Sequence, residues 1–97
     1  MLNSKQKRQL KSMAMQESAL YQIGKNEIGE SMLDMLDKAL TARELIKISV
    51  LKSQTVAIRE LALDLSSALH ADVVQIIGRV IVLYRKNEKE PKIKLVK

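Results

Sequence analysis

The stretch LYQIGKNEIGE, residues 20–30, passes from apolar residues into a glycine, a short polar loop and a second glycine. The pattern predicts a short strand over residues 19–23, a loop, and a helix that starts near Glu30. Gly24 has no Cβ and lets a ligand approach the backbone, while Lys25 adds a positive charge. The first N–H groups of the helix lack partners within it and favour anions. The stretch therefore predicts a phosphate-binding loop between a strand and a helix.

Two residues compete for the N-cap of this helix. With Gly29 as the N-cap, Ile28 and Leu33 have the spacing of a hydrophobic staple. With Asn26 as the N-cap, Gly29 lies in the first turn and costs about 0.5–1 kcal/mol relative to alanine. We therefore predict a helix over about residues 30–42. Its apolar face follows a period of 3.6 residues and consists of Met32, Leu33, Leu36, Ala39 and Leu40.

Upstream, a basic segment predicts a helix over about residues 5–17, with Ser4 as its N-cap. Its apolar stripe around Leu10 is narrow, and no acidic residue precedes Glu17. The cations that point away from this stripe are Lys7, Arg8 and Lys11. They predict a phosphate-binding ridge, with a merely solvated helix face as the alternative.

Downstream, residues 44–52 alternate as a strand does. We expect one face to be buried (Ile46, Ile48 and Val50) and the other to be partly wet (Leu45, Lys47, Ser49 and Leu51). A turn over residues 53–55 leads to an amphipathic helix. The apolar positions of that helix are Ile58, Leu61, Ala62, Leu65, Ala68 and Leu69.

Two β-branched runs, residues 73–77 and 80–85, are separated by Gly78 and Arg79. A two-residue connection with glycine first predicts a hairpin with a type II′ turn. Residues 87–92 are charged and hold the single proline, which predicts a loop, and residues 93–96 are expected to add an edge strand.

The order helix, strand, helix, strand, helix, hairpin predicts an α/β fold. We expect a small mixed four-stranded sheet packed with three helices, in the order α-β-α-β-α-β-β, with the strands that flank a helical crossover lying parallel. A chain of 97 residues with 46% hydrophobic residues is expected to form one domain over residues 1–97.

Charge and composition limit the partners. The net charge of +6 and the pI of about 9.7 point to a polyanion. The longest apolar run, residues 73–84, is interrupted by Gly78 and Arg79 and is shorter than the ~20 residues of a membrane span. The chain lacks cysteine and an apolar signal segment near Met1, so we expect a cytoplasmic protein without a membrane partner.

Catalytic chemistry has little support in the sequence. His70, the single histidine, falls at the end of a predicted helix, where a capping role is favoured over a ligand or base role. Asp34 and Asp37 lack a histidine partner and are interpreted as solvated rather than as metal ligands. The loop after Gly24 lacks the motif of nucleotide triphosphatases. We predict a protein that is not an enzyme and has no cofactor or metal; a metal-dependent RNA cleavage assay would test the hydrolase alternative.

The aromatic content restricts how RNA could be read. Phe and Trp are absent, and the two tyrosines are Tyr84, expected to be buried, and Tyr21, which could lie on either face of its strand. Base stacking is therefore minor, and recognition of phosphates and folded RNA shape is favoured. Of the five methionines, Met13 and Met32 are expected to pack in the core rather than form an adaptable binding surface.

Several stretches together resemble the small single-domain proteins of the CRM (chloroplast RNA splicing and ribosome maturation) family, including the bacterial YhbY-like proteins. The stretches are SKQKR at 4–8, YQIGK at 21–25, ARELIK at 42–47, VQIIG at 74–78 and VLYR at 82–85. The resemblance covers nearly the whole chain. It implies an RNA-binding α/β domain similar to the C-terminal domain of bacterial translation initiation factor three. Bacterial stand-alone members associate with precursors of the large ribosomal subunit.

The family loop is G-x-x-G, comparable to the loop with which KH domains clamp an RNA backbone. Gly24, Lys25 and Asn26 match its first three positions, whereas Glu27 stands where the second glycine is expected. A Cβ and a carboxylate at that position hinder close approach of a phosphate.

The resulting hypothesis is a non-enzymatic, monomeric ribosome-assembly factor whose partner is structured ribosomal RNA. RNA binding is assigned to the loop and to the basic helix beside it, with two arginines as lesser contributors. The residues are Lys7, Arg8, Lys11, Gly24, Lys25, Asn26, Arg79 and Arg85. The alternative is a module that docks the basic helix on an acidic protein or an anionic membrane surface.

Overall fold

The sheet is the centre of the fold. The computed structural model describes residues 2–24, 29–52, 54 and 56–97, and within them four strands pair in the order β1-β2-β4-β3. The strands are β1 (Tyr21–Ile23), β2 (Leu45–Val50), β3 (Asp72–Ile77) and β4 (Val80–Tyr84). β1 runs parallel to β2, whereas β4 is antiparallel to both β2 and β3. The predicted mixed four-stranded sheet is confirmed.

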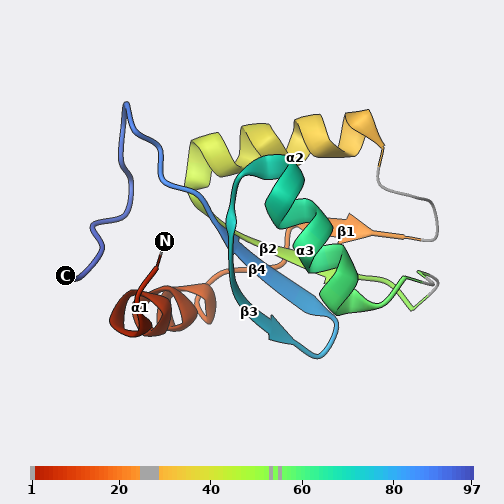
Figure 1. The fold of residues 1–97 in the computed structure, drawn as a ribbon, viewed down its shortest axis with the longest axis horizontal. Helices are drawn as coiled ribbons and strands as arrows, with labels where there is room; N and C mark the ends of the chain where they lie inside the picture. The colour runs from red at the N-terminus through yellow and green to blue at the C-terminus, as the bar shows by residue number, and fades with distance from the viewer. Residues whose placement is uncertain (1, 25–28, 53, 55) are drawn as a thin grey trace.

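Helices cover both faces of the sheet (Figure 1). They are α1 (Ser4–Ala14), α2 (Glu30–Arg43) and α3 (Ile58–Leu69). α2 and α3 bury their apolar stripes on one face, against Ile46, Ile48 and Ile81. α1 packs on the other face, where Leu10 and Ala14 meet a second cluster that contains Leu45, Val82 and Tyr84. The chain therefore forms the predicted α/β fold, with its single basic helix alone on one side of the sheet.

The start of α1 differs from the prediction. Asn3, not Ser4, is the N-cap: its side-chain oxygen accepts the Gln6 backbone N–H at 2.8 Å, and the Gln6 side chain accepts the Asn3 N–H at 3.0 Å. This reciprocal capping box satisfies two N–H groups that the helix leaves unpaired. The helix ends at Ala14, three residues before the predicted Glu17.

α2 begins as predicted, with Gly29 as its N-cap and Glu30 as its first residue. Ile28, the proposed first half of the hydrophobic staple, lies outside the described residues. The hairpin is also confirmed: Ile77 pairs with Val80 across Gly78 and Arg79. Gly78 has a φ of +56° and Arg79 has no positive φ, as a type II′ turn requires.

The buried face of β2, with Ile46, Ile48 and Val50, is confirmed, and the other face departs from the prediction at Leu45. Lys47 and Ser49 are half-buried, as expected for a partly wet face, but Leu45 is buried because α1 and Tyr84 cover it. Met13 and Met32 pack against the two cores as predicted, whereas Met15 and Met35 are exposed. Tyr84 is buried, and Tyr21 is half-buried against the core under α2 and α3.

The predicted edge strand over residues 93–96 is wrong. Instead, an irregular C-terminal segment (residues 86–97) packs along α1, with Ile93 and Leu95 against the second core cluster. Its backbone groups bond to side chains rather than to a strand, because Gln9 accepts the Val96 N–H and donates to the Lys94 carbonyl. Among the described helices, none is long and apolar enough to cross a membrane.

Candidate nucleic-acid interface

The basic ridge is carried by α1. Lys5, Lys7 and Arg8 are exposed and Lys11 is half-buried, while Leu10 and Ala14 hold the opposite side of the helix in the core. No acidic residue occurs between Ser4 and Ala14. The helix therefore presents cations that no carboxylate of its own neutralises.

The Gly24 loop starts at the end of the parallel pair β1–β2. The Leu51 N–H donates to the Ile23 carbonyl at 2.8 Å, and the Gln54 side chain donates to the Gly24 carbonyl at 2.9 Å. Gly24 does not have a positive φ, and a Cβ built on it would meet the Leu51 side chain at an ordinary 3.5 Å. The backbone conformation at Gly24 thus does not require glycine, and its predicted contact with RNA stays a prediction.

Lys25, Asn26 and Glu27 lie outside the described residues, so their predicted roles stay predictions. Arg79, by contrast, is placed close to the start of the loop. Its guanidinium donates to the Val50 carbonyl at 2.8 Å and to the Leu51 carbonyl at 2.6 Å. Leu51 is also the residue whose N–H donates to Ile23. Arg79 therefore ties the hairpin turn to the end of β2 while its residue remains exposed.

Arg85 is held by the protein itself. One guanidinium nitrogen lies 2.7 Å from the Asp37 carboxylate and 2.9 Å from the Leu69 carbonyl. The other donates to the Asp37 carbonyl and the Thr41 hydroxyl. Arg85 thus links the end of β4 to α2 and α3, and its predicted RNA contact would compete with four existing ones. Asp37, predicted to be solvated, is an ion-pair partner with a half-exposed side chain.

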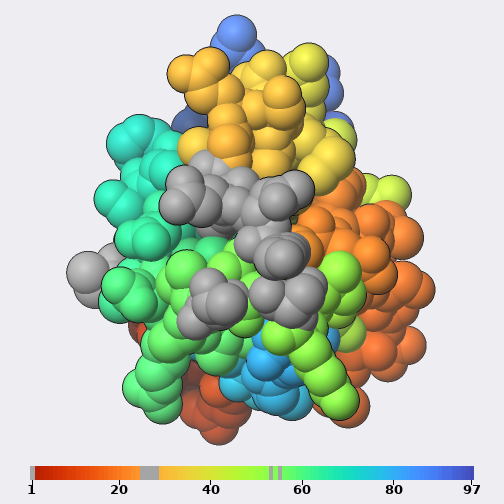
Figure 2. All heavy atoms as spheres, turned by 90° about the vertical axis from the view of Figure 1, so that its right-hand side faces the viewer, coloured from red at the N-terminus to blue at the C-terminus, as the bar shows by residue number. Residues whose placement is uncertain are grey.

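The two parts of the predicted clamp do not lie side by side. Figure 1 shows α1 near the chain termini, at one end of the long axis, whereas β1 points toward the other end, and the loop follows β1. Figure 2 views the end of the molecule that lies on the right in Figure 1, where α2 (yellow) and α3 (green) are exposed. The prediction that the basic helix lies beside the loop is wrong, because β1 carries the chain away from α1 before the loop begins.

The other titratable candidates have structural roles. His70 lies at the end of α3, as predicted, and is its C-cap in the left-handed conformation, with φ of 53° and ψ of 44°. Over the described residues, no three His, Cys, Asp or Glu side chains form a group that could hold a metal ion. Asp34 and Asp37 are therefore not part of such a group.

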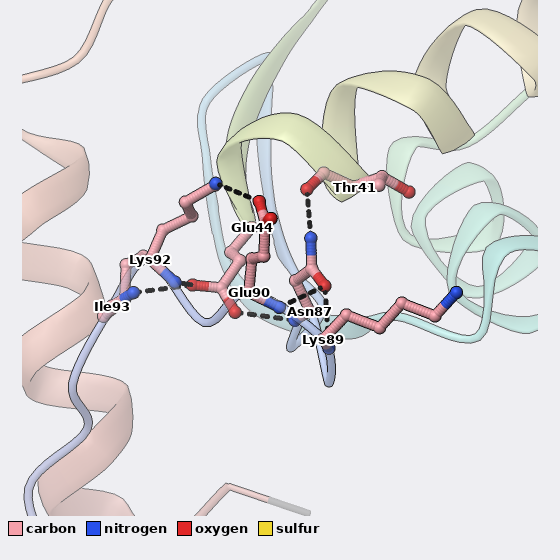
Figure 3. A network of polar contacts seen from close by, with 7 residues as sticks. All are labelled: Thr41, Glu44, Asn87, Lys89, Glu90, Lys92 and Ile93. Carbon is pink, nitrogen blue, oxygen red and sulfur yellow. Dashed lines mark hydrogen bonds and ion pairs between the residues drawn. The ribbon is translucent and has the colours of Figure 1, made fainter.

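Sequence reasoning missed one functional-looking residue, Glu44. It follows α2 with a φ of 64°, and its side chain is fully buried. One carboxylate oxygen accepts the N–H groups of Lys92 and Ile93, and the other accepts that of Asn87, each at 2.6 Å (Figure 3). Asn87 also donates from its side chain to the Thr41 carbonyl. Nothing in the sequence indicates this role of Glu44, because its partners lie more than forty positions away along the chain.

Glu44 also influences Tyr84. Burial is the main cause that raises the pKa of the Tyr84 phenol above its usual value of 10.0, and the negative charges of Glu44, Asp72 and Glu88 raise it further. The Tyr84 hydroxyl is buried and makes no hydrogen bond within the described residues. The second core cluster therefore contains a neutral phenol next to a buried carboxylate.

Comparison with known proteins identifies the family. The sequence profile of the CRS1/YhbY (CRM) domain matches residues 2–85. The chain belongs to this family. It is 38% identical over 95 residues to "Probable RNA-binding protein YqeI" of Bacillus subtilis (strain 168), covering 98% of this chain and 99% of that protein. It is 33% identical over 91 residues to "Probable RNA-binding protein PA4753" of Pseudomonas aeruginosa, covering 94% and 88%.

A solved structure shares the fold of this chain. The solution structure of SAV1595, a hypothetical RNA-binding protein of Staphylococcus aureus, matches with a TM-score of 0.82 and 43% sequence identity. The match covers 99% of this chain and 100% of that one. The arrangement of helices and strands described above is therefore shared with this relative.

Proposed function

We propose that this CRM domain protein binds structured ribosomal RNA in precursors of the large ribosomal subunit and acts there as a non-enzymatic assembly factor. The observation that carries the proposal is the outward side of α1, which holds Lys5, Lys7, Arg8 and Lys11 without a carboxylate between Ser4 and Ala14. Such a surface binds phosphates by displacing their counterions. The RNA-binding names of the relatives support RNA as the polyanion.

The second contact in this proposal is the Gly24 loop, with Lys25 and Asn26 at the phosphate and Arg79 beside the loop. α1 lies at one end of the molecule, and β1, which the loop follows, points toward the other end (Figure 1). An RNA that reaches both must extend across the protein or fold around it. This separation favours a structured RNA over a short single strand, in keeping with the scarcity of aromatic residues. Arg85 has a lesser part, because Asp37 already holds it.

We further propose a monomeric cytoplasmic protein that binds without catalysing a reaction. Asp37 pairs with Arg85, so one of the side chains considered for a metal or catalytic role already has a structural partner. The protein's contribution to assembly is then binding alone, which holds or shields an RNA segment.

Sedimentation of a cell lysate tests the proposal. The protein should co-sediment with large-subunit precursors, and ribonuclease should release it. Crosslinking and mapping of the nucleotides would then place the contacts within large-subunit RNA. If the protein stays with another protein or with vesicles after ribonuclease treatment, the docking-module alternative is correct.

A further inference from the structure

The positive charge of the chain is concentrated in two segments that are far apart in sequence. Residues 4–14 carry four cations and no acid, and residues 86–97 carry five lysines and two glutamates. Together they hold a net charge of +7, whereas the whole chain has +6, so the remaining residues are slightly acidic. The feature that attracts a polyanion therefore belongs to these two segments.

The two segments pack against each other. Gln9 accepts the Val96 N–H at 2.8 Å and donates to the Lys94 carbonyl at 2.8 Å, while Gln6 donates to the Val96 carbonyl at 2.9 Å. Figure 1 shows the C-terminal segment descending beside α1. Ile93 and Leu95 pack against the core under α1. Lys92, which precedes Ile93, and Lys94, which lies between the two apolar residues, are exposed.

The upstream end of the segment is anchored as well. The buried Glu44 carboxylate accepts the N–H groups of Asn87, Lys92 and Ile93 (Figure 3). The Asn87 side chain in turn accepts those of Lys89 and Glu90. Because both ends are held by hydrogen bonds and the middle by apolar packing, the backbone of the lysine-bearing stretch is ordered before any ligand binds. A preorganised cationic surface loses less conformational entropy on binding than a flexible tail does.

Helical geometry makes the two surfaces continuous. Gln9 and Lys5 are four residues apart and share one flank of α1, the flank on which the C-terminal segment lies. Steps of three or four residues lead from Lys5 around the exposed side of the helix through Arg8, Lys11 and Lys7. The glutamates of the segment precede Pro91, and from Lys92 onward its charged residues are lysines only.

From these observations we infer that the C-terminal segment is a further RNA-contacting element, in which Lys92 and Lys94 bind phosphates of the same RNA that binds α1. The family profile ends at residue 85, so this element lies outside the matched domain. The inference rests on the proposed function. The Lys92 amine is 3.5 Å from the Glu90 carboxylate in an exposed ion pair, which is weak enough to exchange for a phosphate.

Four full-length proteins test the inference: wild type, Lys92→Gln/Lys94→Gln, the α1 triple variant Lys7→Gln/Arg8→Gln/Lys11→Gln, and Lys38→Gln/Arg43→Gln. The last removes two cations from exposed positions of α2, on the other face of the sheet, and is the charge-matched control. Binding to deproteinised large-subunit ribosomal RNA is measured from about 50 to 200 mM salt. Urea unfolding verifies that each variant is folded.

The Lys92/Lys94 variant should lower the slope of log K against log salt by about 1.4–1.8, at 0.7–0.9 per lost contact, and the α2 control should leave it unchanged. If the α1 triple variant lowers the slope and the Lys92/Lys94 variant does not, the inference fails while the proposed function stands. An equal effect of the α2 control also overturns it. If wild type shows no salt-dependent RNA binding, the proposed function itself fails.

Chemical modification supplies a second readout on the unmodified sequence. RNA should protect Lys92 and Lys94 from acetylation, as measured by mass spectrometry, whereas Lys38 should stay reactive. Full reactivity of Lys92 and Lys94 in the presence of saturating RNA would overturn the inference independently of any substitution.

Discussion

The Glu44 carboxylate accepts the Ile93 N–H at 2.6 Å and so joins the end of α2 to a residue 49 positions further along the chain. The same carboxylate accepts two more backbone N–H groups, from Asn87 and Lys92. A buried charge is stable only when hydrogen bonds compensate for its loss of hydration. Here the compensation comes entirely from the backbone of the C-terminal segment, which makes the segment part of the fold.

Removal of this carboxylate should therefore destabilise the protein strongly. Glu44→Ala removes the buried acceptor of three partly buried backbone N–H groups, and we expect the free energy of unfolding to fall by roughly 2–4 kcal/mol. Urea denaturation followed by circular dichroism measures the change. Glu88→Ala removes an exposed carboxylate from the same segment and should stay within about 0.5 kcal/mol of wild type. Equal stability of the two variants would show that the Glu44 network contributes nothing.

What the sequence could predict follows from the range of the interactions. The helix that starts after Gly29 and the hairpin at Gly78 depend on neighbouring residues, and both were predicted correctly. The C-terminal segment was predicted to hold an edge strand over residues 93–96, and that prediction was wrong. Its backbone instead bonds to Glu44 and Gln9, and no local pattern reveals such distant partners.

The site was predicted less completely for the same reason. Lys7, Arg8 and Lys11 could be assigned to an exposed sector from helical periodicity alone, and Lys7 and Arg8 are exposed. Arg85 has the same charge, but its partners Asp37 and Leu69 belong to α2 and α3, which are distant from it in the sequence. A sequence pattern counts charges and cannot show which of them the fold already neutralises.

Tyr84 should make stability depend on alkaline pH. Its pKa is raised in the folded protein, so above about pH 10 the unfolded chain releases a proton that the folded chain retains. This contribution to stability is fully present below pH ~10 and is lost as the pH rises through the folded value. Tyr84→Phe should therefore lose less stability than wild type between about pH 8 and pH 11, as measured by urea denaturation.

The same variant has a predicted effect at neutral pH. The Tyr84 hydroxyl is buried without a hydrogen bond among the described residues, so its removal should leave stability unchanged or raise it by up to about 1 kcal/mol. Tyr21→Phe removes the same atom from a half-buried ring and serves as the matched control. A loss of stability at neutral pH in Tyr84→Phe alone would mean that the hydroxyl is bonded in solution.

Arg85→Ala should lower the stability of the protein more than its affinity for RNA. The guanidinium bonds Asp37, Leu69 and Thr41, and its side chain is 21% exposed. We expect a loss of roughly 1.5–3 kcal/mol, because charge-assisted bonds to partly buried groups are lost together. Lys86→Ala, at the next and more exposed position, should change stability by less than about 0.5 kcal/mol. If Arg85→Ala is as stable as wild type yet binds RNA less well, the main role of Arg85 is to contact RNA and not to stabilise the fold.

The α1 triple variant tests the ridge itself. Replacement of Lys7, Arg8 and Lys11 with glutamine should lower the log–log salt slope of RNA binding by about 2.1–2.7 if all three contact phosphates. Stability should change little, since Lys7 and Arg8 are exposed and glutamine is a good helix former. A wild-type slope in this folded variant would show that α1 does not contact RNA.

Gly24→Ala tests the loop with little risk to the fold. Gly24 does not have a positive φ, and the added Cβ would meet Leu51 Cδ1 at 3.5 Å, so stability should stay within about 0.5 kcal/mol of wild type. If a phosphate approaches this backbone closely, the methyl group occupies part of its space, and RNA affinity should fall while the salt slope stays nearly constant, because no charge is lost. Gly29→Ala is the matched control, since its Cβ meets no atom within 4 Å at the other end of the loop. Equal affinities of the two variants and wild type would remove Gly24 from the interface and leave the RNA on the α1 side of the sheet.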